Sequence, residues 1–257
     1  MNGLAIMNND FNFTYIEPEK QFSDFVESSG IFFNSSTTPK EVVVLPDGRI
    51  DLFFWKSDEE TFEIILLGLE TVAEQRSLPP KTIIYVISFK PLAVEYLLRE
   101  SIAELLNTGK KLPYGFWSFG INDLNDFDTF CLKANQQLAI HLPAKIDERK
   151  RKLFELIYAS NGEMTVKALS ENVFWSSRQI NRYFTQQFGL PLKAYCSILR
   201  FRASLNHIAK GKLFPELNFT DQTYFIKEIR KFSGVVPREL SQNKNDRFVL
   251  LSVLKQK

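Results

Sequence analysis

Short runs of β-branched and aromatic residues dominate the chain up to residue 89 and predict strands. The runs lie at residues 11–16, 41–45, 50–55, 62–69 and 82–89, with proline-containing turns between them. Several short strands separated by turns are typical of a small barrel or sandwich. After Pro91 the apolar residues recur at helical spacing, which predicts helices at about 92–106 and 123–138. We expect these helices to pack on the barrel or to form a dimer contact.

From residue 147 onward the spacing of apolar residues is helical throughout. A first helix is predicted from Asp147 to about Ser160, and Thr165 can cap a short helix over 166–172. Ser176 and Gln179 form a capping-box pattern that opens a helix over 176–188.

A long apolar stripe then predicts a helix from Pro191 to about Ala209, roughly 27 Å long at 1.5 Å per residue. Asp221 or Thr220 can cap a last major helix that ends near Phe232. The pattern therefore predicts an α+β chain of two domains. The N-terminal domain is a small β-barrel or sandwich with packed helices, and the C-terminal domain is all-α, with two helix-turn-helix units joined by a linker helix.

The outward positions of the helix over 176–188 carry Arg178, Asn181 and Arg182. Arginine can donate to guanine O6 and N7, and asparagine can pair with adenine N6 and N7, so these residues suit major-groove reading. A merely solvated helix face would show the same residues. The repetition of the arrangement downstream favours the DNA-reading interpretation.

The helix over 221–232 presents Gln222, Thr223 and Lys227 outward, and Arg230 and Lys231 follow near its end. We expect Arg230 and Lys231 to contact phosphates, which position a protein on DNA without reading its sequence.

Charge divides the chain into two unequal halves. Residues 145–257 contain 21 Lys+Arg against 10 Asp+Glu, a net of +11, whereas residues 1–144 contain 11 against 20, a net of −9. This division predicts an acidic domain over 1–144 and a basic, polyanion-binding domain over 145–257, with a linker near Pro143. Chance together with a solvated surface is the alternative explanation.

The composition and the small number of candidate catalytic or metal-binding residues argue against several other classes of protein. The apolar runs are too short to span a bilayer, and the first residues lack the pattern of a signal peptide. Two cysteines and two histidines lie far apart in sequence, so no disulfide framework and no metal site are expected, and a reducing cytoplasm fits. Asp47 and Asp51 are close in sequence without a histidine or cysteine partner. No nucleophile, base and orienting group can be assembled, so neither an enzyme nor a cofactor is predicted.

Two segments carry a family resemblance. SRQINRYFTQQFGLPLKAYCSILRFRASL and NFTDQTYFIKEIRKFSGVVPREL resemble the two halves of the DNA-binding domain of AraC/XylS transcription regulators. More weakly, PDGRIDLFF, LLGLET and FKP resemble a barrel domain of uncharacterised function found in some members of that family. The resemblance implies two helix-turn-helix units on one linker helix, and it places the six outward residues from Arg178 to Lys227 named above at the family's base-facing positions.

The chain departs from the family pattern in two places. The stretch from Lys212 to Asn218 is shorter than the usual support helix of the second unit and contains Pro215, and Phe174 stands where glycine is usual. The leading hypothesis is a cytoplasmic, bacterial, sequence-specific regulator of transcription that binds double-stranded DNA. It would carry a possible small-molecule effector in its N-terminal half and could form a homodimer. The alternative is a ligand-sensing or protein-interaction module with weakened DNA binding.

Overall fold

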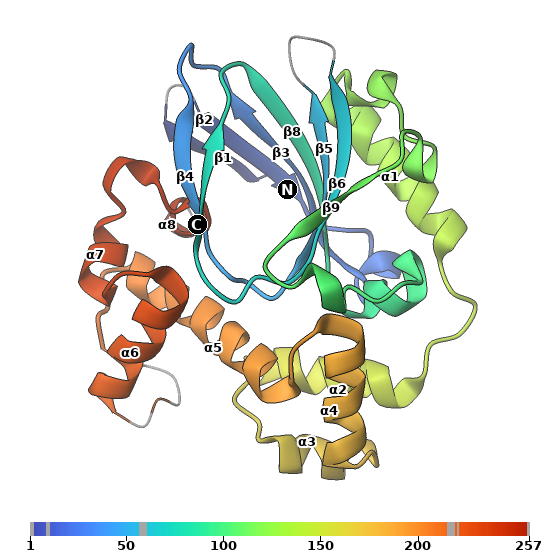
Figure 1. Cartoon of the computed structure of the whole chain (residues 1–257), viewed down its shortest axis with the longest axis vertical. Helices are drawn as coiled ribbons and strands as arrows, with labels where there is room; N and C mark the ends of the chain where they lie inside the picture. The colour runs from blue at the N-terminus through green and yellow to red at the C-terminus, as the bar shows by residue number, and fades with distance from the viewer. Residues whose placement is uncertain (1–2, 9–10, 57–60, 215–218, 220, 256–257) are drawn as a thin grey trace.

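The computed structural model describes residues 3–8, 11–56, 61–214, 219 and 221–255. Its N-terminal half contains a seven-stranded antiparallel sheet in the order β1-β2-β3-β8-β5-β6-β9 and a two-stranded ribbon of β4 and β7 (Figure 1). The strands are β1 (Gly3–Asn8), β2 (Phe11–Ile16), β3 (Val26–Asn34), β4 (Lys40–Val44), β5 (Ile50–Lys56), β6 (Phe62–Leu67), β7 (Glu74–Leu78), β8 (Thr82–Phe89) and β9 (Gly109–Leu112).

The large sheet has two apolar faces because alternate side chains of a strand point to opposite sides. In β5, Leu52 and Phe54 are fully buried beneath helix α1 (Phe127–His141), where Phe54 packs 5.3 Å from Phe130. Asp51 and Phe53 point to the other side and line an internal cavity. The β4–β7 ribbon closes the other side of this cavity, so the predicted barrel or sandwich with packed helices is confirmed.

Four strands (β1, β3, β7 and β9) were not predicted from the sequence, and one predicted helix differs from the structure. Strand β3 contains Ser28, Ser29 and Gly30 at its centre, and β7 reads EQRSL, so neither has the apolar pattern used to find strands. The predicted helix over 92–106 is wrong. A π-helical turn (Val94–Leu98) ends at Arg99, which has a left-handed backbone with φ of 57°, and a short 3-10 turn (Ala103–Leu105) follows.

The C-terminal half is entirely helical in its regular elements. Its helices are α2 (Glu148–Ala159), α3 (Val166–Val173), α4 (Ser177–Phe188), α5 (Leu192–Ala209), α6 (Gln222–Ser233), α7 (Pro237–Gln242) and α8 (Val249–Lys255). The predicted caps are confirmed, because Thr165, Ser176 and Asp221 each accept a backbone hydrogen bond at the start of α3, α4 and α6. Gly189 and Gly234 end α4 and α6 with positive φ, as glycine allows.

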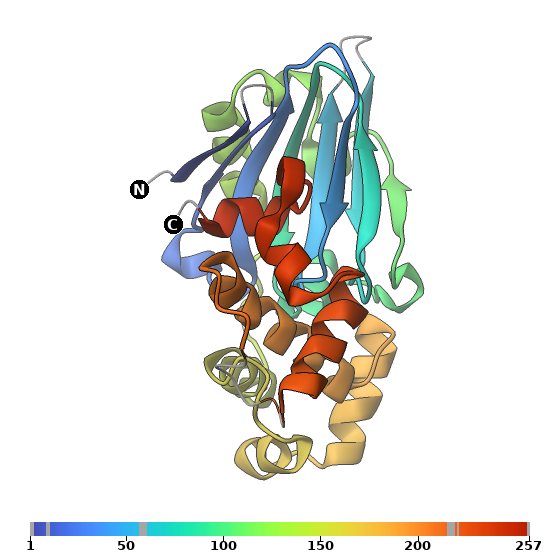
Figure 2. The same ribbon diagram turned by 90° about the vertical axis from the view of Figure 1, so that its left-hand side faces the viewer.

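Helix α8 returns the chain to the sheet half (Figure 2). Its preceding residue Phe248 forms a parallel bridge with Val43 of β4, and the Val43 amide donates to the carbonyl of Arg247 over 2.6 Å. Val253 of α8 is buried with Phe11 and Val42. The last helix therefore closes the sheet half rather than extending the second helix-turn-helix unit.

One hydrophobic core joins the two halves. It runs without interruption from Phe54 and Phe130 in the sheet half to Phe154, Phe184 and Tyr195 in the helical half. A second core joins α5, α6, α7 and α8 to Leu45, at the end of β4. The acidic and basic halves predicted from sequence thus pack tightly on one another. Over the described ranges, no helix is long and apolar enough to cross a membrane.

Candidate functional sites: a nucleic-acid interface and an internal cavity

Helix α4 presents two of its predicted DNA-reading residues to solvent. Ser176 and Gln179 form the predicted capping box, with a Gln179 Oε1 to Ser176 nitrogen distance of 3.1 Å. Arg178 and Arg182 are exposed one turn apart on the face opposite the buried Ile180 and Phe184. Two guanidinium groups on one exposed helical face can approach a DNA groove together.

Asn181 has local hydrogen-bond partners. Its Nδ2 donates to the Ser177 carbonyl over 3.0 Å, and its Oδ1 accepts from the Leu192 amide over 3.2 Å. Leu192 is the first residue of α5, so Asn181 satisfies one of the amide groups left open at that helix start. Contact with an adenine would require Asn181 to give up these two bonds.

Helix α6 presents the second set of predicted residues. Gln222, Thr223, Lys227 and Arg230 are all exposed, while Phe225, Ile229 and Phe232 are buried on the opposite face. The Lys231 ammonium lies 4.7 Å from the Phe232 ring centre and 3.9 Å from Glu228. The helix therefore has the predicted amphipathic division.

The two departures from the family pattern lie beside these helices. Phe174 has a left-handed backbone with φ of 52° and is 91% exposed, at the turn between α3 and α4. Part of the Lys212–Asn218 stretch, residues 215–218, lies outside the described residues, so the missing support helix stays a prediction. Phe219 packs 5.0 Å from Phe225.

Helix α4 is tied directly to the sheet half. The Ile102 amide donates to the Gln187 carbonyl over 2.9 Å, and the Ser101 hydroxyl donates to the Gln186 carbonyl over 2.6 Å. On the other side of the helix, the Tyr183 hydroxyl donates to Glu95 over 3.2 Å. The orientation of α4 is therefore fixed by residues of both halves.

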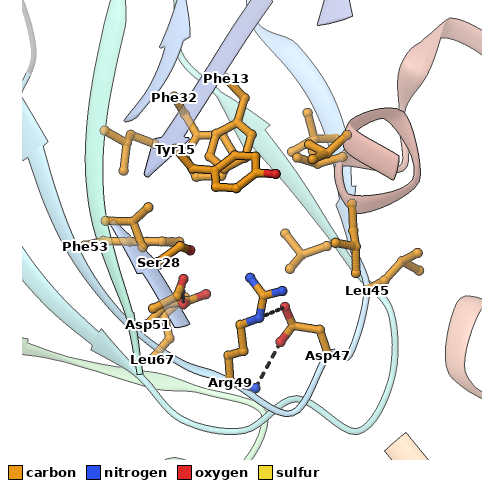
Figure 3. Close-up of a pocket in the computed structure, with 18 of the residues that line it drawn as sticks. Phe13, Tyr15, Ser28, Phe32, Leu45, Asp47, Arg49, Asp51, Phe53 and Leu67 are labelled. Carbon is orange, nitrogen blue, oxygen red and sulfur yellow. Dashed lines mark hydrogen bonds and ion pairs between the residues drawn. The ribbon is translucent and has the colours of Figure 1, made fainter. Parts of the chain in front are cut away.

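A cavity of about 560 Å³ lies between the large sheet, the β4–β7 ribbon, α5 and α8 (Figure 3). One end is aromatic, where the ring of Phe13 stacks 4.4 Å from Phe32 and 5.6 Å from Tyr15. The opposite end is charged and contains Asp47, Arg49 and Asp51. Such a size and a mixture of apolar walls with a few polar groups are typical of small-molecule sites.

Glu27 holds α5 to the charged end of the cavity. It forms an ion pair with Arg202 of α5, and it lies 3.5 Å from Arg49 and 3.8 Å from Lys90. Burial alone would raise the pKa of Glu27, but the positive charges of Arg202, Arg49 and Lys90 bring it down to about 2. Arg49 Nε also lies 3.1 Å from Asp47. These cations are therefore shared among carboxylates of the protein itself.

Asp51 has a different environment. The Ser88 hydroxyl donates to Asp51 over 2.6 Å, and among the described residues no lysine or arginine forms an ion pair with this carboxylate. Burial and the charge of Asp47 raise the pKa of Asp51 to about 6. Burial and the charges of Asp47, Asp51 and Glu74 raise the pKa of nearby Glu70 to about 8. Asp51 is thus a carboxylate at the charged end of the cavity whose hydrogen-bond partner is a hydroxyl group and not a cation.

Asp47 and Asp51 are close together in the sequence, but no role was predicted for them. The missing information was the position of Ser28 and Ser88, which lie in register with Asp51 across β3, β8 and β5. Polar residues inside otherwise apolar strands could have signalled this row. Over the described part of the chain, no group of three His, Cys, Asp or Glu side chains is arranged to hold a metal ion.

The chain matches one family model and several solved structures. A domain of unknown function (DUF6597) matches residues 14–110, and no curated protein matches. A crystal structure of ToxT from Vibrio cholerae is 14% identical with a TM-score of 0.44, covering 83% of this chain and 97% of ToxT. ToxT bound to (E)-4-(8-methylnaphthalen-1-yl)but-3-enoic acid is 12% identical with a TM-score of 0.45, covering 95% and 100%. At these values the likenesses carry neither function nor ligand to this chain.

Proposed function

We propose that this protein is a sequence-specific DNA-binding regulator of transcription that reads the major groove with α4 and α6. The observation that carries the proposal is the pair of capped, amphipathic helices with exposed cationic and polar faces. They lie in a half of the chain with a net charge of +11, which favours attraction to phosphates. The resemblance of this half to AraC/XylS regulators supports the same function.

The roles proposed for individual residues of α4 and α6 follow from the exposure of their side chains. Arg178 and Arg182 would read bases from α4, with Asn181 as a third base-facing position that also holds the start of α5. Gln222, Thr223 and Lys227 would read bases from α6, and Arg230 and Lys231 would contact phosphates. Helix α5 separates the two units as a rigid element of 18 residues, about 27 Å long.

Selection of DNA fragments from a random pool by the full chain, followed by gel shifts at several salt concentrations, tests this function. We expect one preferred sequence with two boxes on the same face of the duplex, about one helical turn apart. A failure to enrich any sequence at low salt would refute the proposal. Enrichment of a single box would restrict reading to one helix.

A ligand-sensing role is the second candidate function, and the 560 Å³ cavity favours it. Because α5 and α8 contribute to the cavity wall, a bound effector would touch α5, which packs against α6, and α8, which packs against α5. Ligand sensing and DNA binding are therefore compatible in one regulator. A chain that binds small molecules without sequence-selective DNA binding would instead be a sensor or interaction module.

A homodimer formed through the sheet half is a further proposal. Leu132 and Ile140 of α1 are 66% and 69% exposed although both are large and apolar. A second copy of α1 would cover them. Sedimentation of the chain and of a Leu132→Glu variant tests this, and a monomeric wild-type chain would refute it.

A further inference from the structure

The cavity has two chemically distinct ends, and its ligand must satisfy both. Phe13, Tyr15 and Phe32 form a stack of aromatic rings at one end, while Asp51 lies at the other end near Ser28 (Figure 3). Ser88 lies between them in register and donates to Asp51. An apolar ligand would cover Asp51 without giving it a partner, which is costly for a buried carboxylate. The ligand therefore needs a polar group at one end and an apolar body.

The charge expected on the ligand's polar group follows from the ion pairs that the cationic side chains of the cavity already form. Arg202 is paired with Glu27, Arg49 is shared between Glu27 and Asp47, and Arg76 is paired with Glu74. An anionic ligand would have to displace these carboxylates or approach Asp51 directly. Like charges at such short range disfavour one another strongly in a buried site.

A positively charged group on the ligand would be favoured beside Asp51. Asp51 receives one hydroxyl hydrogen bond, from Ser88, and a carboxylate has two oxygens that can accept several more. The raised pKa of Glu70 and of Asp51 reflects, after burial, the mutual repulsion of carboxylates at this end, and a cation would relieve it.

We propose that this cavity binds a small amphipathic organic cation, whose ammonium or amidinium group donates to Asp51 while its apolar body packs against Phe13, Tyr15 and Phe32. The inference names the ligand class of the cavity and so rests on the proposed effector-sensing role. It does not depend on which DNA sequence the chain reads.

A matched series of probes with one apolar body and three head groups tests the ligand class. Isothermal titration of the full chain at pH 7.5 with 4-phenylbutylamine, 4-phenylbutanoic acid and 4-phenylbutanol compares cation, anion and neutral group. This pH is above the value of about 6 for Asp51, so its carboxylate is ionised. We expect the amine to bind about tenfold more tightly than the alcohol, and the acid to bind most weakly.

Two variants assign the effect to Asp51. Asp51→Asn keeps the shape and the acceptor for Ser88, so it should remove the advantage of the amine and leave binding of the alcohol intact, which also reports that the cavity is folded. Asp128→Asn makes the same change of charge at an exposed position of α1 and should leave the order of the probes unchanged.

Tighter binding of the acid, equal binding of all three probes, or an undiminished preference for the amine in Asp51→Asn would each overturn the cation inference. Absence of binding by all three probes would overturn it as well. Because no DNA is present in these titrations, failure of the DNA-binding proposal shows separately, as a lack of enrichment in the selection experiment.

Discussion

Helices α4 and α6 present similar polar faces but are attached to the sheet half by different contacts. Helix α4 is bonded directly to it through Ser101, Ile102 and Glu95, and its buried face belongs to the core that continues to Phe54. Helix α6 packs on α5 and α7, in a core that also contains residues of α8 and Leu45 of the sheet half. Helix α4 is therefore part of a continuous body, whereas α6 is held by α5, which also lines the cavity. We expect a cavity ligand to influence α6 more than α4.

Removal of a buried side chain from each unit gives the largest expected effects. Phe184→Ala should destabilise the chain by about 3–5 kcal/mol, because Phe184 is fully buried among Phe154, Phe188 and Tyr195. Ile229→Ala, in the buried face of α6, should cost about 2–5 kcal/mol. Denaturant titration measures both values.

Hydrogen exchange then separates the two units. We expect Phe184→Ala to weaken protection in both halves and Ile229→Ala to weaken it mainly from α6 to α8. Equal loss of protection throughout the chain in both variants would contradict the distinction between the units.

Substitution of Glu27 tests its ion pair with Arg202, which attaches α5, the helix between the two units, to the sheet half. Glu27→Gln should destabilise the chain by about 2–3 kcal/mol at pH 7, because it leaves the partly buried Arg202 without its carboxylate. The folded pKa of about 2 lies below the ordinary value of 4.5, so this stabilisation is complete above pH 4.5 and is lost as the pH falls towards 2.

Unfolding curves of wild type and variant should therefore converge on acidification. Glu104→Gln, at an exposed position, serves as the control for loss of one carboxylate. A difference that stays constant from pH 7 to pH 2 would show that Glu27 acts by shape and not by charge.

Exposed residues of α4 and α6 separate base reading from phosphate contact. Arg182→Ala should cost about 1–3 kcal/mol in binding to the selected sequence and relax preference at one base position. Lys231→Ala should weaken binding to all sequences alike and reduce the salt dependence by about one charge. Competition gel shifts with single-base variants of the selected site measure both effects. Identical behaviour of the two variants on every sequence would remove Arg182 from base reading.

Substitution of Phe174, in the turn before α4, should have the smallest effect on stability. Phe174 is exposed and its backbone is left-handed, so Phe174→Gly should stabilise the chain by about 0.5–1 kcal/mol. Phe174→Ala keeps a Cβ atom in the same conformation and should give little of this gain. A loss of stability in Phe174→Gly would indicate that the aromatic ring makes a stabilising contact of its own.

The helical half was predictable because its signals are local. Ser176, Gln179 and Gly189 announce the start and the end of α4 within the sequence of the helix itself, and the structure has the helix where they place it. The sheet half was harder, since β3 is polar at Ser28 for a reason that lies across the sheet, beside Ser88 and Asp51. The predicted helix near Arg99 was wrong although the apolar spacing is helical, because Arg99 has a left-handed backbone that interrupts the helix.

The cavity could not be predicted from these patterns. Its wall combines Phe11 and Val42 of the sheet half with Val253 of α8, and no short-range pattern links residues so far apart. Arg202 shows the same limit, since its helix was predicted but its ion pair with Glu27 was not.

The position of α8 also sets the order in which the molecule can be completed. During synthesis the strands can pair as soon as they emerge, but Val253 follows Val42 by more than 200 residues in the chain. The aromatic interior of the sheet half therefore stays open until both helix-turn-helix units have been made and α8 has docked beside β4. A ligand that needs the completed cavity wall would then bind only chains that already carry both α4 and α6.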